Sequence, residues 1–400
     1  MKYDVCVIGG CGHAGLPLSI AFALRGKRCV IVDRDADAMQ KVRDGVMPFM
    51  EENGQESLLE ALKSGNLDVR DDLSVISQSD AVVLVVGTPI DSHLTPSFGA
   101  IDAVLEQHFP YFVEDQLVVL RSTLYPGTSE RVVRWAERRG VRLHVATCPE
   151  RIAEGFALRE ISDLPQLVGS FSSEGLKRAV ALFSALTDDI IVLEPLEAEL
   201  AKLFNNAWRY IKFATANQFF MIATECGADF RNVYQGMTAR YPRGADLPGP
   251  GFAAGPCLFK DTMQLSALTN NQFFIGHASM LVNEGLPQFV IKQMKSRYPL
   301  RDMTVGILGM SFKANIDDMR DSLSLKLRDL LEMEAKGTIC SDPFVHFPGF
   351  VDAEEAVRRA DVLVVATPHE QYKTLQLHGK PVFDIWNVLP EQGEPVRQAS

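Results

Sequence analysis

The chain has 400 residues, 46% hydrophobic and 23% charged, the balance of a globular protein with two or three domains. Its net charge of −11 argues against nucleic acid or an anionic membrane surface as the main partner. The seven cysteines include no Cys-x-x-Cys pair, so we expect neither a disulfide framework nor a metal site. No apolar run is long enough to span a bilayer and no basic leader is present, so a cytoplasmic protein is expected.

The first segment alternates strand and helix patterns around a glycine-rich turn. A β-rich apolar run, Tyr3–Ile8, leads into Gly10-x-Gly12-x-x-Gly15. A helical pattern follows over Leu16–Leu24, and a second strand is predicted over Cys29–Val32. Strand, glycine-rich turn, helix and strand in this order predict a dinucleotide site. The glycines allow a tight turn, close approach of a pyrophosphate, and close packing of helix on strand.

A carboxylate at the end of the second strand indicates which dinucleotide binds. Asp33 lies near the place where an acidic side chain binds the ribose hydroxyls of the adenosine half. Such a side chain repels a 2′-phosphate, so NAD is expected rather than NADP, although the adjacent Arg34 weakens the distinction. Further cofactor contacts are expected from the turn, at His13 and Ala14 as well as the glycines.

Later strands are predicted to bring polar side chains to one edge of the same sheet. Apolar runs suggest strands in 80–89, Gln116–Leu120, Val141–Ala146 and Asp189–Leu193. Ligands of an open α/β sheet bind beyond the carboxyl ends of its strands. Four side chains after these strands are therefore expected to converge on one crevice, namely Thr88, Thr123, Glu150 and Glu154. Each of them could instead be a helix cap or a turn former.

The middle of the chain has a helical character. Glu197–Gly227 is a helical pattern with no Gly or Pro before its end, and such a helix spans roughly 45 Å. It could cross between domains and dock on a partner subunit. Lys202 and Asn206 share one of its faces, although both could simply be solvated. Its aromatic residues are expected in a core or a dimer interface: Phe204, Trp208, Phe213, Phe219 and Phe220. A further helical region is expected over 262–297.

Between these helical regions lies a stretch rich in Gly and Pro, residues 248–257, called here the cysteine loop. Pro256 suits a first helical position, which would place Cys257 in the first turn, where the helix dipole favours a thiolate. Lys260 and Asp261 would fall on the same face. A thiol with a cation and a carboxylate in reach could be an activated nucleophile. A buried, inert cysteine is the alternative, and this stretch alone leaves both open.

The last hundred residues resume an α/β pattern. Strands are expected over Met303–Leu308 and Thr338–Ser341, with a helix between them, and 361–368 closely echoes the run 80–89. No complete Gly-x-Gly-x-x-Gly is present, so a ligand other than the dinucleotide is expected. Lys313 and Arg320 are candidate anion binders, with surface solvation as the alternative.

These patterns predict an α/β fold of two Rossmann-like, doubly wound parallel-sheet domains joined by a long central helix and a helical middle domain. The expected boundaries are 1–194 for the NAD-binding domain, 195–298 for the central helical domain, and 299–400 for the second Rossmann-like domain.

Ordered motifs across nearly the whole chain resemble those of the UDP-glucose/GDP-mannose dehydrogenase family, whose members oxidise a nucleotide sugar at C6 to a uronic acid. The motifs are Gly10-x-Gly12-x-x-Gly15-Leu-Pro, Ser122-Thr-x-x-Pro-Gly-Thr128, Pro149-Glu-Arg-Ile-Ala-Glu-Gly155, Lys202-x-x-x-Asn206, Gly251-Phe…Cys257-x-x-Lys-Asp261, and Met310-Ser-Phe-Lys313 with Asp318-Met-Arg320. The resemblance implies a UDP-sugar substrate, NAD as cofactor and a homodimer or higher homo-oligomer. It also implies that 195–298 is the dimerisation and catalytic domain and that 299–400 binds the nucleotide sugar. It also favours the nucleophile reading of Cys257.

The resemblance further implies a role for each matched position. Cys257 would attack the C6 aldehyde, and a second oxidation would give a thioester that water hydrolyses. Lys202 and Asn206 would stabilise the oxyanion. Asp261 and Thr123 would position water or relay protons, and Glu150 would act as acid/base in hydrolysis. Glu154 and Arg320 would lie near the cofactor. The remaining substrate contacts implied are Arg151, Arg243, Phe252, Lys260 and Lys313.

The cysteine loop departs from the family pattern, with alanines at 253 and 254 and one extra residue before Cys257. The sugar could be glucose or an N-acetylhexosamine, with UDP favoured over GDP. A single-step β-hydroxyacid-type dehydrogenase, a nucleotide-sugar epimerase and a non-catalytic NAD-sensing module are the alternatives. None of the three accounts for the cysteine loop.

Overall fold

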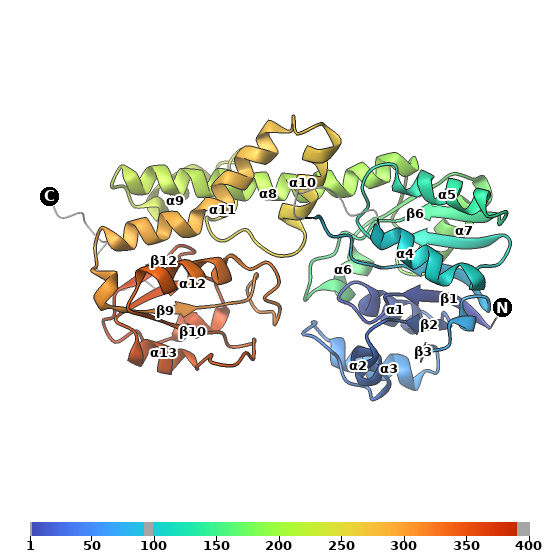
Figure 1. Ribbon diagram of the computed structural model, residues 1–400, viewed down its shortest axis with the longest axis horizontal. Coiled ribbons are helices and arrows are strands. Elements are labelled where there is room, and N and C mark those ends of the chain that lie inside the picture. Colours follow the sequence, from blue (N-terminus) through green and yellow to red (C-terminus); the bar gives the residue numbers. More distant parts are fainter. Residues whose placement is uncertain (1, 92–98, 390–400) are drawn as a thin grey trace. The chain divides into compact units, whose positions relative to one another are not determined.

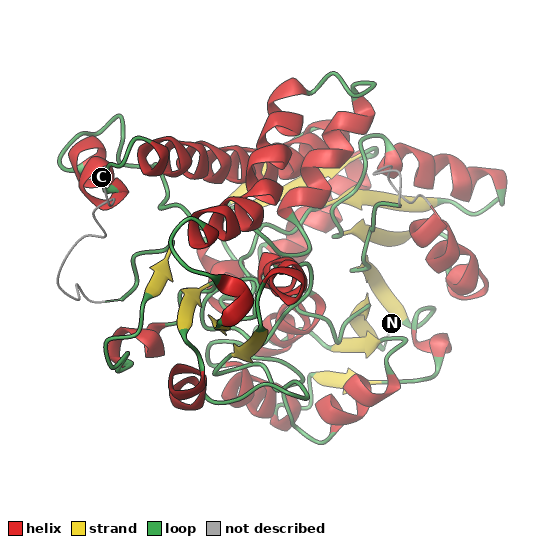
Figure 2. Ribbon diagram, turned by 60° about the vertical axis from the view of Figure 1, so that its left-hand side comes forward, coloured by secondary structure: helices red, strands yellow, loops and turns green. Residues whose placement is uncertain are grey.

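The computed structural model describes residues 2–91 and 99–389. It forms two compact units, Met1–Asn205 and Asn206–Ser400. Strands alternate with helices in both (Figures 1 and 2). Among the described residues, no helix combines the length and the apolar character needed to cross a membrane.

The first unit is built on one sheet with the strand order β3-β2-β1-β4-β5-β6-β7-β8. Neighbouring strands are parallel except β6 and β7, which are antiparallel. The strands are β1 (Tyr3–Ile8), β2 (Cys29–Val32), β3 (Leu67–Val69), β4 (Ser79–Leu84), β5 (Gln116–Leu120), β6 (Leu143–Thr147), β7 (Gln166–Ser170) and β8 (Ile190–Val192).

Helices cover both faces of this sheet, so its strands are apolar on both sides. Alternate residues of β1 show the pattern: Val5 and Val7 join one core cluster, while Cys6 and Ile8 join the other. The first cluster contains side chains of α1 (Gly15–Leu24), α2 (Ala36–Arg43), α3 (Gly54–Lys63), α6 (Ala157–Asp163) and α7 (Ser173–Phe183), and the second those of α4 (Gly99–His108) and α5 (Thr128–Arg138). Short 3₁₀ turns lie at η1 (Leu73–Val75) and η2 (Phe109–Tyr111).

The second unit has a smaller parallel sheet with the order β10-β9-β11-β12. Its strands are β9 (Thr304–Leu308), β10 (Gly337–Ser341), β11 (Val362–Val365) and β12 (Val382–Asp384). Side chains of α11 (Phe274–Lys295) and α12 (Leu323–Glu334) pack on one face, and those of α13 (Ala353–Arg359) on the other. The turns η3 (Leu300–Asp302) and η4 (Glu370–Thr374) connect these elements.

The resemblance between the runs 80–89 and 361–368 reflects an equivalent place in each sheet. β4 pairs in parallel with β1, the first strand of its sheet, and β11 pairs in parallel with β9, the first strand of the other. The prediction of two Rossmann-like parallel-sheet regions is thus confirmed.

The central helix is confirmed as α8 (Pro195–Glu225), within which the boundary between the two units falls. It is followed by α9 (Phe230–Thr238) and α10 (Leu258–Leu268). The further helical region expected over 262–297 is present as two helices, since α10 ends at Leu268 and α11 begins at Phe274. Asn270 and Asn271 both adopt left-handed backbone conformations there. Such residues end a helix, and the N–H of Asn271 caps the Ser266 carbonyl at 2.7 Å.

Candidate active site

The glycine-rich turn between β1 and α1 has the geometry that a dinucleotide site requires. A Cβ built on Gly15 would lie 2.2 Å from the Gly9 carbonyl oxygen, so only glycine allows α1 to approach the turn this closely. A Cβ on Gly12 would meet nothing nearer than 3.9 Å. The backbone at Gly12 therefore faces open space and leaves room for a pyrophosphate. These residues fit the predicted cofactor.

The carboxylate at the end of β2 stabilises this turn directly. Oδ2 of Asp33 accepts a hydrogen bond of 2.9 Å from the Cys11 N–H, and its Oδ1 accepts one of 3.0 Å from the Asp35 N–H. Cys11 is buried, and burial raises the pKa of its thiol to about 12. Arg34 is exposed. The turn and the carboxylate predicted to bind the ribose are thus joined by a hydrogen bond.

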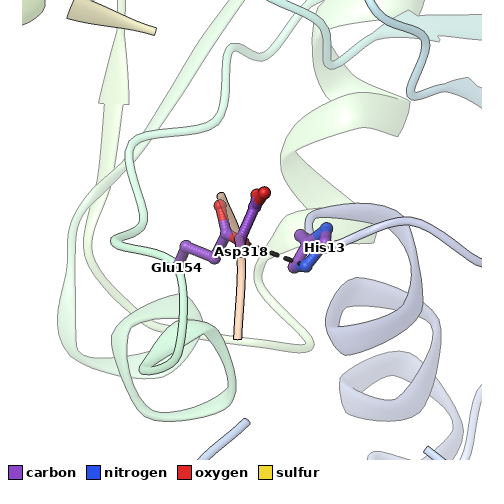
Figure 3. A group of neighbouring side chains, drawn as sticks. All are labelled: His13, Glu154 and Asp318. Carbon is purple, nitrogen blue, oxygen red and sulfur yellow. Dashed lines mark ion pairs between the residues drawn. The ribbon is translucent and has the colours of Figure 1, made fainter. Parts of the chain in front are cut away.

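Two predicted cofactor residues meet beside the same turn. Nε2 of His13 lies 2.9 Å from Oε1 of Glu154, which belongs to the loop after β6 (Figure 3). The His13 ring also stacks on Phe49, with ring centroids 4.1 Å apart. A side chain from the glycine-rich turn is therefore fixed between two segments that are distant in sequence.

The loops after β4 and β5 are tied to each other. Oγ1 of Thr88 donates a 2.6 Å hydrogen bond to the Thr123 carbonyl, and Oγ of Ser122 accepts one of 2.8 Å from the Val86 N–H. Both bonds lie at the carboxyl ends of adjacent parallel strands. Thr88 and Thr123 therefore lie at the edge of the sheet where ligands of such folds bind.

Glu150, after β6, is the predicted catalytic carboxylate of the first unit, and both of its oxygens accept hydrogen bonds. Its Oε1 accepts N–H groups of Arg151 at 2.6 Å and of Ile152 at 3.0 Å. Its Oε2 accepts from the guanidinium of Arg121. The Arg151 guanidinium bonds the Pro165 carbonyl, and burial lowers the pKa of Arg151 below its ordinary value. Arg121 was given no role by the sequence, although an arginine closing a fully apolar strand is a detectable signal.

In the second unit, Cys257 is exposed and stands at the N-cap of α10. The predicted place in the first turn is wrong, because the helix begins at Leu258, two positions after Pro256, and Cys257 directly precedes it. Gly255, with φ of +96°, turns the chain just before this cap. The carbonyl of Cys257 accepts the first helical hydrogen bond, 2.9 Å from the Asp261 N–H. The alternative of a buried, inert cysteine does not fit the structure.

One turn into α10, Asp261 is completely buried and lies between two predicted site residues. Its Oδ2 accepts a 2.6 Å hydrogen bond from Nδ2 of Asn206, and its Oδ1 lies 3.0 Å from Nζ of Lys260. Lys202, one turn before Asn206 on α8, is also buried. A buried carboxylate requires such partners, and here they are residues predicted for the same site.

The cysteine loop is held by a buried amide network that the sequence did not predict. Asn217 of α8 exchanges two hydrogen bonds with the backbone of Gly251: its Nδ2 donates to the carbonyl at 2.9 Å, and its Oδ1 accepts the N–H at 2.7 Å. Its Nδ2 also donates to Oδ1 of Asn283 on α11 at 2.9 Å. The side chain of Phe252 is buried in the core of this unit. Its predicted substrate contact stays a prediction.

The segment with Lys313 and Arg320 follows β9, and buried polar groups shape it. The carboxylate of Asp342 accepts the N–H groups of Met310 at 2.7 Å and Ser311 at 2.9 Å, and it pairs with Nε2 of His369 at 3.0 Å. Burial alone would raise the pKa of Asp342, but the histidine and the backbone N–H groups hold it below its ordinary value.

The predicted anion binders differ in their surroundings. Lys313 is partly buried, whereas Arg320 is exposed and donates from Nε to Oδ2 of Asp318 at 2.8 Å. Arg243 is exposed, between α9 and the cysteine loop, and its Nη1 lies 3.4 Å from the Tyr241 hydroxyl.

The chain combines a mostly parallel sheet that carries a dinucleotide-type turn, a second, parallel sheet, and an exposed helix-capping cysteine in the sequence that joins them. These are the features of an NAD-linked dehydrogenase of nucleotide-sugar type. Three domain models of the UDP-glucose/GDP-mannose dehydrogenase family match the chain: the NAD binding domain at residues 3–187, the central domain at 196–284, and the UDP binding domain at 306–391. The chain belongs to this family. NAD as cofactor and a UDP-sugar as the class of substrate agree with these domains.

Two related dehydrogenases match this chain over almost the full length of both sequences. The chain is 28% identical over 404 residues to a UDP-N-acetyl-D-mannosamine dehydrogenase of Pyrococcus horikoshii, covering 96% of this chain and 95% of that protein. It is 28% identical over 405 residues to an NDP-N-acetyl-D-galactosaminuronic acid dehydrogenase of Ralstonia nicotianae, covering 94% of each.

Solved structures of two nucleotide-sugar dehydrogenases have the same fold over nearly the whole chain. The UDP-D-ManNAc dehydrogenase from Pyrococcus horikoshii superposes with a TM-score of 0.90 at 26% identity, over 98% of this chain and 97% of that one. A UDP-glucose dehydrogenase from Pyrobaculum islandicum gives 0.89 at 27% identity, over 96% and 94%.

Proposed function

We propose that the protein oxidises the C6 hydroxymethyl group of a UDP-sugar to a carboxylate in two steps, through a thioester on Cys257. The observation that carries the proposal is the arrangement at the start of α10. An exposed thiol caps the helix, and one turn later a buried carboxylate is held by Asn206 and Lys260. A single-step dehydrogenase has no use for such a thiol, which is why the two-step reaction is preferred over the β-hydroxyacid type.

Each residue has one task in this reaction. Two molecules of NAD⁺, bound one after the other, would each accept one hydride, one in each oxidation. Sγ of Cys257 bonds to the aldehyde carbon formed first, and Lys202 and Asn206 stabilise the resulting oxyanion. Loss of the second hydride from C6 leaves a thioester. The oxygen of water then bonds to that carbon while the carbon–sulfur bond breaks, with Glu150 accepting a proton from the water and the sulfur leaving as thiolate.

The buried carboxylate and the threonine complete the proposal. Asp261 fixes the amide of Asn206 through its 2.6 Å hydrogen bond, so the amide donor is oriented before substrate arrives. Asp261 and Thr123 position water or relay protons. Within the first unit, the residues that hold the cofactor are Gly10, Gly12, His13, Asp33 and Glu154.

For the sugar we propose UDP-N-acetyl-D-mannosamine. The relatives that match over nearly their whole length include several with that activity, from archaea and from Yersinia pestis, at 26–28% identity. UDP-glucose is the second candidate, since a UDP-glucose dehydrogenase is structurally about as similar.

We also propose that a second copy of the chain docks on α8. Phe204, Trp208, Phe219 and Ile222 are all exposed on this helix at spacings that place them along one side. Exposed apolar patches of this kind mark association surfaces. Analytical ultracentrifugation of the wild type and of Trp208→Glu tests the proposal: a dimer or larger assembly that dissociates in the variant supports it, and a monomeric wild type contradicts it.

Two matched variants test the role of the cysteine. Cys257→Ser should abolish formation of the uronic acid while leaving NAD binding intact. Cys226→Ser changes another exposed cysteine in the same unit and should keep full activity. If Cys257→Ser still converts UDP-N-acetylmannosamine to the acid at a rate near that of wild type, the thioester route is wrong.

A further inference from the structure

We infer that Arg121 is a positioning residue for Glu150, and that it acts in one step of the reaction only, the hydrolysis of the thioester. The inference rests on the proposed function, because it assigns a step to the carboxylate that Arg121 holds. It adds a residue to the mechanism whose side chain touches neither cofactor nor sugar.

Both Nη atoms of the Arg121 guanidinium are held by hydrogen bonds within the first unit. Its side chain is completely buried. Nη1 donates to the Cys148 carbonyl at 3.0 Å and to Oε1 of Gln166 at 2.9 Å, and the Phe183 ring lies 5.0 Å from Cζ. Nη2 donates to Oε2 of Glu150. A buried cation requires a counter-charge, and Glu150 is its ion-pair partner.

The carboxylate of Glu150 reaches outward from this buried anchor. Its side chain keeps 12% of its surface exposed, against none for Arg121. Oε1 already accepts two backbone N–H groups, from Arg151 and Ile152. A carboxylate oxygen has two acceptor sites, so after bonding Arg121, Oε2 keeps one. That remaining acceptor site can hold a water molecule for attack.

The ion pair is not needed to hold the two strands together. β5 and β6 are parallel neighbours, and their carboxyl ends are joined by backbone hydrogen bonds. The Cys148 N–H donates to the Leu120 carbonyl at 3.0 Å, and the Glu150 N–H to the Arg121 carbonyl at 3.1 Å. What the guanidinium adds is the direction of the Glu150 side chain. Arg121 therefore sets the position of Oε2, and through it the position of the attacking water.

A double-mutant cycle tests the inference. The proteins are the wild type, Arg121→Gln, Glu150→Gln and the double variant, with Arg178→Gln as control. Arg178 is a partly buried arginine of the same unit that bonds the backbone and carboxylate of Asp80. Single-turnover NADH formation measures the two oxidations, steady-state turnover measures the whole cycle, and intact-protein mass detects the acyl group on Cys257.

The expected result is specific to one step. Glu150→Gln should turn over about 100-fold more slowly or worse, the range for loss of a general base, and should accumulate the acyl-enzyme. Arg121→Gln should form NADH in the first turnover at close to the wild-type rate, and should also accumulate the acyl-enzyme. The double variant should be no more than about threefold slower than Glu150→Gln, because the arginine acts through the glutamate. Arg178→Gln should match the wild type.

Two additional points keep the test decisive. Arg121→Gln leaves a carboxylate without its counter-charge, so if it fails to fold, the double variant, which removes both charges, and Arg121→Lys, which keeps the cation, take its place. Arg121→Lys should recover part of the hydrolysis rate, since a lysine cannot reproduce the forked geometry.

The outcomes separate the inference from the proposed function. If Arg121→Gln slows the first-turnover NADH and the steady state equally, or if the double variant shows the product of the two single effects, Arg121 is merely structural and the inference is overturned. If Glu150→Gln itself accumulates no acyl-enzyme, the role proposed for Glu150 is wrong, and the inference about Arg121 is wrong with it.

Discussion

Removing the Asn217 side chain should loosen the cysteine loop and destabilise the second unit. Asn217 is completely buried and makes three hydrogen bonds, two with the backbone of Gly251 and one with Asn283. In Asn217→Ala, the Gly251 N–H and carbonyl and Oδ1 of Asn283 lose these partners. Leaving a buried polar group unpaired costs about 1–3 kcal/mol. Since partial rearrangement recovers some of this, we expect a loss of about 3–5 kcal/mol.

Scanning calorimetry measures this loss. For a unit of this size, each kcal/mol lowers the transition temperature by about 2–4 °C, so the transition of the second unit should move by roughly 6–20 °C. The matched control is Asn232→Ala, which removes an exposed amide from α9 of the same unit and should change stability by less than about 0.5 kcal/mol. A shift in Asn217→Ala no larger than that of Asn232→Ala would contradict the prediction.

Three further predictions concern the loop, the C-terminal network and the cofactor site. Gly251→Ala should destabilise the second unit by several kcal/mol, because the added Cβ would lie 2.4 Å from the Trp386 ring; thermal unfolding measures this, and an unchanged transition contradicts it. Asp342→Asn should cost stability at neutral pH. The pKa of Asp342 in the folded protein lies below its ordinary value of 3.8. The stability that its charged carboxylate contributes is therefore complete above pH 3.8, and it is lost as the pH falls through the folded-state pKa. Urea unfolding of both proteins should thus show their difference shrinking in acid, and a constant difference would be contrary evidence. Asp33→Ala should weaken NAD binding by about tenfold or more, because it removes the carboxylate predicted to bind the ribose and the acceptor for the Cys11 N–H. Calorimetric titration measures the affinity, and equal affinity in the two proteins would exclude a role of Asp33 in NAD binding.

Features encoded locally were predicted well from the sequence. The strand Tyr3–Ile8 and the glycine-rich turn follow from a short apolar run and from glycine spacing. The central helix follows from thirty residues without a helix breaker, and it was placed within two residues at each end. The break between α10 and α11 was missed, because asparagine is compatible with a helix interior and only the structure shows Asn270 and Asn271 to be left-handed.

Features that depend on contacts distant in the sequence were not predicted. The antiparallel pairing of β7 with β6 leaves no signal in either strand. Arg121 meets Glu150 only because β5 and β6 are neighbours in the sheet. Asn217 lies in a helix whose polar residues look solvated until the cysteine loop folds back onto it. The chemistry-bearing residues could be named from motifs, whereas the residues that orient them require the fold.

The most direct test of the two-step reaction is the number of NADH molecules formed per sugar consumed. UDP-N-acetylmannosamine, UDP-N-acetylglucosamine, UDP-N-acetylgalactosamine and UDP-glucose are supplied in parallel, with Cys257→Ser as the inactive control. Two NADH per sugar and a uronic acid as product are expected on one of these four substrates. UDP-N-acetylmannosamine is the first candidate. One NADH per sugar, or none on any UDP-sugar, would contradict the thioester mechanism.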